Sequence, residues 1–289
     1  MLRSFVAAAL LAVTPALHAQ EPFQVEVVGS GPPMLLIPGL TSNGEVWQRT
    51  VAEFSKDHEV HVFSLAGFAG VPPIATDSGW LLRQREAIVA YVRDRRLERP
   101  VIVGHSLGGF LALWIAADHP DLPSAIVNVD GIPFFGVLMN PNATRETMRP
   151  MAAQMHQMMM APGARENYLR MQDAQLRMMA RDTAAHAMLA RHGRDRDMGT
   201  MAIAMHDMYV EDLRADLARV RVPVLNVHAW AAYAAMGQSR AGIEGIAADQ
   251  YAALRSQRLR IHDSAYHFVM LDEPEWLHRE MREFLSSRQ

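Results

Sequence analysis

One short stretch of the chain has residue types suited to covalent catalysis. The sequence Gly-His-Ser-Leu-Gly-Gly at residues 104–109 places Ser106 at the centre of a Gly-x-Ser-x-Gly pattern. An apolar run at residues 101–103 precedes it, and a helical pattern at residues 107–118 follows it. On a tight turn from strand to helix a serine hydroxyl stands exposed, and glycines avoid clashes where the strand and the helix pass closely. Ser106 is the predicted nucleophile; the alternative is a glycine-rich turn with an incidental serine.

The segments around this turn alternate between strand and helix patterns. Short apolar runs typical of strands lie at residues 23–28, 34–37, 60–63, 101–103, 125–129, 222–228 and 259–261. Helical spacing of apolar residues is found at residues 44–56, 80–96, 107–118, 238–254 and 274–287. Strands alternating with helices predict an α/β fold with a doubly wound, mostly parallel sheet.

One long segment breaks this alternation. Residues 134–220 show helix signals and no convincing strand, and fifteen of the 20 methionines lie between Met139 and Met208. We expect a helical cap inserted into a core formed by residues 20–133 and 221–289. Because methionine is flexible and polarizable, two interpretations stay open: an adaptable lid over a substrate pocket, or ordinary helix packing with methionine as filler.

Three motifs together resemble the α/β-hydrolase family. They are Ile37-Pro38-Gly39-Leu40, the serine turn at residues 104–109 and His267-Phe268, which occur in the family's order and spacing. The resemblance extends over residues 23–285, and the cap is its least specific part. It implies the α/β-hydrolase fold and a serine hydrolase that forms an acyl-serine intermediate, with no metal or organic cofactor.

The resemblance also implies where negative charge would be stabilised. Acyl transfer develops an oxyanion, which preorganised N–H donors stabilise. One donor should be the backbone N–H of Leu107, the residue after the nucleophile. By analogy the second is the N–H of Leu40, on a loop where family members often have a histidine and this chain has Pro38. The alternative for this loop is a plain turn that ends a strand.

A serine hydroxyl is a weak nucleophile and needs a histidine to accept its proton. The chain has 13 histidines, so residue type alone does not identify the base. In the family the base lies between the last strand and the final helix, which points to His267. His262 is nearer the strand and is the weaker candidate. His105 adjoins the serine, but we expect its side chain to pack beneath the turn.

The acid is where the chain departs from the family. Many members place it after the strand that follows the cap, but residues 229–237 contain no carboxylate, and the next one is Glu244. The strand at residues 125–129 ends instead at Asp130, and the carboxyl ends of parallel strands are where such sheets bind ligands. Asp130 also keeps the chain order serine, acid, histidine. We assign it as the acid that orients His267; the alternative is a turn residue, because Asp-Gly is common in turns.

Three aromatic residues are candidates for the substrate pocket. Phe68 lies on a loop that corresponds to a Pro-Gly-Phe-Gly loop of the family, and Trp230 and Tyr233 follow the strand that lacks the acid. Each aromatic side chain taken alone is more often part of a core. The predicted substrate is a small-molecule carboxylic ester. A thioesterase, amidase or acyltransferase would use the same triad, and a slow-turnover ligand-binding receptor or a relative that has lost activity also stays open.

Composition argues against nucleic-acid binding, disulfides and metal sites. The net charge of −3 gives no general attraction to nucleic acid, and we expect no such partner. The absence of cysteine excludes disulfides and thiolate metal sites, and no histidine spacing suggests another metal site. The sequence is silent on oligomeric state.

The first residues resemble an export signal. Arg3 forms a short basic region, residues 5–13 form an apolar run, and Leu17-His18-Ala19 resembles a cleavage site that ends in a small residue. This pattern predicts a signal peptide at residues 1–19. We therefore expect a periplasmic or secreted protein with no membrane span after cleavage, because this run is shorter than the roughly 20 apolar residues that spanning needs. The alternatives are an uncleaved anchor or a first strand of the domain.

Overall fold

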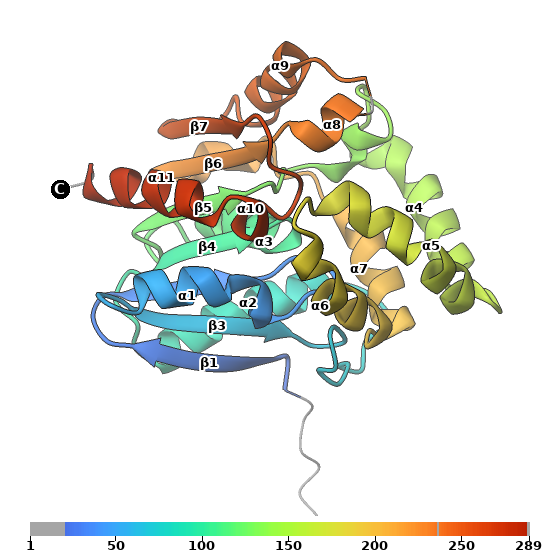
Figure 1. The fold of residues 1–289 in the computed structure, drawn as a ribbon, viewed down its shortest axis with the longest axis horizontal. Helices are drawn as coiled ribbons and strands as arrows, with labels where there is room; N and C mark the ends of the chain where they lie inside the picture. Colours follow the sequence, from blue (N-terminus) through green and yellow to red (C-terminus); the bar gives the residue numbers. More distant parts are fainter. Residues whose placement is uncertain (1–20, 236, 288–289) are drawn as a thin grey trace, which may run out of the picture.

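A seven-stranded sheet forms the centre of the protein (Figure 1). The computed structural model describes residues 21–235 and 237–287, so the predicted signal peptide lies outside the described residues. The strand order is β1-β3-β2-β4-β5-β6-β7. The strands are β1 (Phe23–Gly29), β2 (Pro33–Ile37), β3 (Glu59–Leu65), β4 (Val101–His105), β5 (Ala125–Val129), β6 (Val224–Ala229) and β7 (Gln257–His262). Only β1 pairs antiparallel, which confirms the predicted mostly parallel α/β sheet.

Helices cover both faces of the sheet, which explains why the central strands are apolar throughout. Leu35 and Ile37 of β2 pack with the helices at residues 80–94 and 107–118. Met34 and Leu36, which alternate with them along the strand, pack with the helices at residues 48–54 and 274–286 on the other face. The helices outside the inserted segment are η1 (Gly44–Trp47), α1 (Gln48–Phe54), α2 (Trp80–Asp94), α3 (Leu107–Asp118), α8 (Ala231–Ala235), α9 (Arg240–Gln250), α10 (Val269–Asp272) and α11 (Pro274–Ser286).

All regular secondary structure in the segment between β5 and β6 is helical. It contains η2 (Phe135–Leu138), α4 (Arg145–Met160), α5 (Ala164–Met179), α6 (Thr183–Arg194), α7 (Met198–Val210) and η3 (Asp216–Arg219). Figure 1 shows α4 to α7 gathered beyond the carboxyl ends of the parallel strands. We call this segment the cap. It stands above the edge of the sheet where the predicted catalytic residues lie.

The methionines of the cap occupy two different environments. Met148, Met201 and Met208 are buried where α4 and α7 pack together, as filler residues would be. Met158 of α4 and Met171 of α5 are exposed instead. Methionine therefore fills the core of the cap and also forms part of its outer surface.

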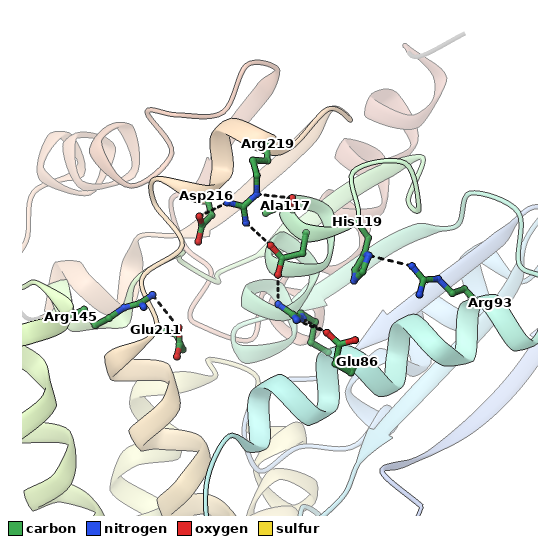
Figure 2. Close-up of polar contacts among 10 residues, drawn as sticks. Glu86, Arg93, Ala117, His119, Arg145, Glu211, Asp216 and Arg219 are labelled. Carbon is green, nitrogen blue, oxygen red and sulfur yellow. Dashed lines mark hydrogen bonds and ion pairs between the residues drawn. The ribbon is translucent and has the colours of Figure 1, made fainter.

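Arginine contacts hold the chain where it leaves the cap and re-enters the core. Figure 2 shows Arg219 of η3 donating to the carbonyl oxygen of Ala117 at 3.2 Å and pairing with Asp216 at 2.6 Å. The same view shows Arg145 at the start of α4 paired with Glu211 after α7 at 3.2 Å. The bond to Ala117 joins η3 to α3 of the core, and the pair of Arg145 with Glu211 joins the start of α4 to the end of α7.

A buried carboxylate also joins the cap to the core. Asp207 of α7 accepts a hydrogen bond of 3.1 Å from the backbone N–H of Leu81, in the first turn of α2. Gly79, which precedes α2, has no side chain to cap this helix. Asp207 therefore caps α2 from another element. Burial raises the pKa of Asp207, although the bond from Leu81 acts in the opposite direction.

Substitutions at Asp207 separate the capping bond from the cost of a buried charge. Asp207→Ala should lower the free energy of unfolding by about 1 kcal/mol, because it removes the cap. Asp207→Asn keeps an acceptor oxygen without the charge, so it should be at least as stable as the wild type at pH 7. Because folding raises this pKa, the wild type should lose stability relative to Asp207→Asn as pH rises through the carboxyl pKa. Urea unfolding at several pH values measures this difference. An equal loss of unfolding free energy with rising pH in the wild type and in Asp207→Asn would contradict the prediction.

Candidate active site

Ser106 stands on a sharp turn between β4 and α3. Its backbone has φ 53° and ψ −116°, and α3 begins at the next residue. Its N–H donates to the carbonyl oxygen of Val129 on β5 at 2.9 Å, which extends the β4–β5 pairing by one residue. A Cβ atom on Gly104 would lie 2.1 Å from the carbonyl oxygen of Gly108, so this crossing requires glycine. The turn has the strand, the helix and the close approach that the Gly-x-Ser-x-Gly pattern predicts.

Asp130 occupies the equivalent turn at the end of β5. It also has a positive φ, of 51°, and its N–H donates to the carbonyl oxygen of Val227 on β6 at 2.7 Å. Its side chain is buried, and Oδ2 lies 2.7 Å from Nδ1 of His267. Oδ1 accepts the backbone N–H of Ala229 at 3.0 Å and lies 3.3 Å from Nδ1 of His228. The structure therefore brings together the predicted acid and the predicted base.

The charge of Asp130 follows from these contacts. Burial alone raises the pKa of a carboxyl group, but the hydrogen bonds from His228 and His267 outweigh it and hold the pKa of Asp130 well below its usual range. An ionised Asp130 makes Nδ1 of His267 the protonated nitrogen. Nε2 of His267 is then the nitrogen that can take a proton from a serine hydroxyl.

The loop that carries His267 is fixed from two sides. His105 is buried beside the nucleophile, its ring centroid 4.5 Å from that of His267, and its Nε2 donates to the carbonyl oxygen of His267 at 3.0 Å. Burial lowers the pKa of His105, so its ring is neutral at pH 7. His262 has another part in this loop: its Nδ1 accepts the N–H groups of Ser264 and Ala265 at 3.3 and 3.1 Å.

Asp272 joins the same loop to the cap. Its Oδ2 accepts the N–H of Tyr266 at 2.8 Å. Its Oδ1 accepts the N–H groups of Arg181 and Asp182, between α5 and α6, at 2.9 Å each. One carboxylate therefore links the loop that carries His267 to the cap.

The two predicted oxyanion donors lie on backbone next to the serine. Leu107 is the first residue of α3, where N–H groups lack partners within the helix. Leu40 follows Gly39, and a Cβ atom on Gly39 would lie only 3.1 Å from Cβ of Ser106 and 2.7 Å from Nδ1 of His105. The loop after β2 thus packs directly against the serine turn.

The three candidate pocket residues have different surroundings. Phe68 is fully buried, with its ring centroid 5.1 Å from that of Trp80, and belongs to the core. Trp230 donates from its indole nitrogen to the carbonyl oxygen of Gln238 at 3.3 Å. The negative charge of Asp130, and after it burial, raises the pKa of Tyr233.

His228 and its partner Tyr251 were missed by the sequence analysis. Nε2 of His228 lies 3.0 Å from the hydroxyl oxygen of Tyr251. A signal existed: Asn128 lies two residues before Asp130, Asn226 lies two residues before His228, and Asn128 pairs with Asn226 across β5 and β6. This register places Asp130 beside His228.

In the described part of the chain, no three His, Asp or Glu side chains cluster in a way that would hold a metal ion. None of its helices has both the length and the apolar character needed to cross a bilayer.

Comparisons with known proteins identify the family. The model of a family described as the alpha/beta hydrolase family matches residues 34–280. The chain belongs to this family. Solved members are similar in fold: an enol-lactonase from Burkholderia xenovorans LB400 has a TM-score of 0.72 and 17% identity, over 91% of this chain and 96% of that chain. An esterase from Exiguobacterium antarcticum has a TM-score of 0.73 and 15% identity, over 91% of this chain and 95% of that chain.

Curated relatives of this hydrolase-family chain match over a shorter length. A pimeloyl-[acyl-carrier protein] methyl ester esterase of Vibrio atlanticus is 33% identical over 115 residues, which are 40% of this chain and 42% of the relative. A protein of the same name in Vibrio parahaemolyticus is 37% identical over 107 residues, which are 37% of this chain and 40% of the relative. The matched region thus spans less than half of these relatives.

Two glycine substitutions test the serine turn. Gly104→Ala should unfold the protein or distort the turn, because the new Cβ would lie 2.1 Å from a backbone oxygen that cannot move independently. Gly245→Ala is the matched control: no atom lies within 4 Å of its Cβ, and alanine in a helix interior should stabilise by about 0.5–1 kcal/mol. Thermal unfolding compares them, and an unchanged Gly104→Ala protein would contradict the described crossing.

Proposed function

We propose that the protein hydrolyses carboxylic esters through an acyl-serine intermediate. The observation that carries the proposal is the 2.7 Å contact between Asp130 and His267, beside the strained turn of Ser106. A buried carboxylate bonded to one imidazole nitrogen leaves the other nitrogen as a proton acceptor. The family membership and the names of the relatives, which are methyl ester esterases, support the same reaction class.

The proposed reaction has two halves. Oγ of Ser106 attacks the carbonyl carbon while Nε2 of His267 takes its proton, and Asp130 stabilises the imidazolium. The N–H groups of Leu40 and Leu107 donate to the oxyanion. Collapse of this intermediate breaks the ester C–O bond, and the leaving alcohol takes the proton from His267. Water then attacks the acyl-serine with His267 as base, which releases the carboxylic acid and restores Ser106.

Small methyl esters are the first substrates to test, because the relatives' names specify a methyl ester. Thioesters and amides belong in the same panel, since all pass through an acyl-serine. We further propose that residues 1–19 direct export, as their composition predicts.

Labelling with a fluorophosphonate probe tests the nucleophile. The wild type should be modified at Ser106, as located by mass spectrometry of the labelled peptide, and Ser106→Ala should take up no label. His267→Ala should react far more slowly, because the hydroxyl then has no base. Labelling elsewhere, or equal labelling of His267→Ala, would rule out the proposed mechanism.

Asp130→Asn tests the acid. The amide preserves the shape but cannot hold His267 in the required tautomer, so kcat should fall by about 10⁴-fold. Asp263→Asn is the control, because that carboxylate lies exposed directly after β7 and pairs with Arg240. Its kcat on the same ester should stay within about twofold of the wild type, since exposed ion pairs contribute little. Full activity in Asp130→Asn would show that another residue serves as the acid.

A further inference from the structure

A surface cavity lies at the edge of the sheet opposite the cap. Residues at the amino ends of the parallel strands line it together with the end of α11. Figure 1 shows that end of α11 on the side of the molecule away from α4 to α7. The cavity has a volume of about 690 Å³, within the range of about 300–1,000 Å³ that is usual for small-molecule sites. The proposed ester hydrolysis does not use it.

Three arginines line this cavity, and none of its described lining residues is an Asp or Glu. They are Arg99, Arg221 and Arg258. Arg99 lies two residues before β4, Arg221 lies three residues before β6, and Arg258 is the second residue of β7. Strand pairing therefore gathers three positive charges that are far apart in the sequence. Like charges repel one another, and a bound anion would relieve that repulsion.

Backbone hydrogen bonds fix the walls of the cavity. The N–H of Ser124 donates to the carbonyl oxygen of Pro100 at 2.9 Å, and the N–H of Val224 donates to the carbonyl oxygen of Ser256 at 3.1 Å. Arg99 has a positive φ of 44°, although the residue before a proline favours extended backbone with negative φ. Backbone strain of this kind is concentrated at ligand sites and other functional positions. The cavity is thus preformed, with a strained arginine at its edge.

The guanidinium groups of the cavity have few acidic partners. Within residues 21–235 and 237–287, no carboxylate pairs with Arg99 or Arg258, and Arg258 lies 3.5 Å from the hydroxyl oxygen of Ser287. Arg221 pairs with Asp121 at 3.2 Å, but the two side chains are 67% and 85% exposed, so this pair is weak. Most N–H donors of the three arginines are therefore available to an anionic ligand.

A phosphate group suits these donors better than a carboxylate group does. A phosphate monoester carries a charge of about −1.5 to −2 at pH 7 and has three strong acceptor oxygens. A carboxylate has one charge and two oxygens. Guanidinium groups bind phosphate through paired N–H···O bonds. Phe284 and Leu285 also line the cavity and give it an apolar side, against which the organic group of a phosphate ester can pack.

We propose that this cavity binds the phosphate group of a phosphate monoester through Arg99, Arg221 and Arg258. The same group occurs in soluble organic phosphates and in the headgroup of phosphatidic acid, and binding experiments separate the two sources. The alternative is that these arginines only neutralise the carbonyl end of α11, where cations are favourable. The proposal does not depend on the proposed function.

Isothermal titration calorimetry at fixed ionic strength tests the site with phenyl phosphate. This probe should bind the wild type saturably, and inorganic phosphate and benzoate should bind more weakly, since one lacks the apolar group and the other the phosphate. Arg99→Gln and Arg258→Gln should each weaken binding by about tenfold or more, because each removes charge-assisted hydrogen bonds. Arg99→Lys keeps the charge without the paired donors, so its affinity should lie between those of the wild type and Arg99→Gln.

Arg83→Gln is the matched control. Arg83 is likewise exposed and has no carboxylate partner among the described residues. It lies in the first turn of α2, next to the cap, and its Nε donates to the hydroxyl oxygen of Thr76 at 3.1 Å. Because salt screens distant surface charges, its affinity for phenyl phosphate should stay within about twofold of the wild type.

Sedimentation with vesicles separates the two sources of the phosphate. Binding to vesicles of phosphatidic acid in phosphatidylcholine, but not to phosphatidylcholine alone, supports a lipid headgroup if Arg258→Gln abolishes it. Binding of phenyl phosphate without binding to either vesicle supports a soluble phosphate ester.

Three results would overturn the proposal. They are no saturable binding of phenyl phosphate or of phosphatidic acid vesicles, equal binding by the wild type, Arg99→Gln and Arg258→Gln, and benzoate binding as tight as that of phenyl phosphate. If Arg99→Gln does not fold, Arg258→Gln and the titrations of the wild type still decide the question. No ester is hydrolysed in these experiments, so their failure is distinct from a failure of the proposed function.

Discussion

The site depends on one buried carboxylate and the donors that it requires. Moving a carboxylate out of water costs several kcal/mol unless hydrogen bonds and opposite charge replace the solvent. Asp130 has its donors in the backbone N–H of Ala229, the ring of His228 and the ring of His267. Two belong to β6 and one to the loop after β7. Satisfying this one charge therefore fixes how the ends of three elements meet.

The sheet supplies this arrangement through a series of bonds between successive strand ends. The N–H of Ser106 bonds to β5, the N–H of Asp130 bonds to β6, and the N–H of Trp230 bonds to the carbonyl oxygen of His262 on β7. Positive φ at a residue other than glycine costs about 1–3 kcal/mol. Ser106 and Asp130 can hold that conformation because each N–H continues the pairing with the neighbouring strand. Two of the six described non-glycine residues with positive φ are thus the ones whose side chains must point above the sheet.

The sequence was sufficient for the fold because both faces of the sheet are covered. Strands buried on both sides produce continuous apolar runs, and each of the seven predicted runs overlaps an observed strand. The cap was harder. Its methionines are buried on α4 and α7 and exposed on α4 and α5, so apolar periodicity does not mark the helix boundaries there.

The contacts of the site were predictable only in part. Ser106 and His267 lie in local motifs, and Asp130 was found because the usual position lacked a carboxylate. His228 was missed because its contact with Asp130 joins residues 98 positions apart. Only the pairing register of β5 and β6 brings them together, and a register is a property of the sheet rather than of either segment.

The register also explains how the proposed acid can directly follow β5 while the proposed base still comes from the loop after β7. In many family members the strand after the cap ends in the acid, and here that strand, β6, ends in the donors that bind it. Neighbouring strands are only about 4.8 Å apart, so a carboxylate displaced by one strand still reaches the same imidazole. The segment after β6 is then free of the acid and forms α8 with Tyr233. Because Asp130 is held by β5 and β6 rather than by that segment, α8 can vary in sequence without displacing Asp130, and variation there is separated from the geometry of the proposed triad.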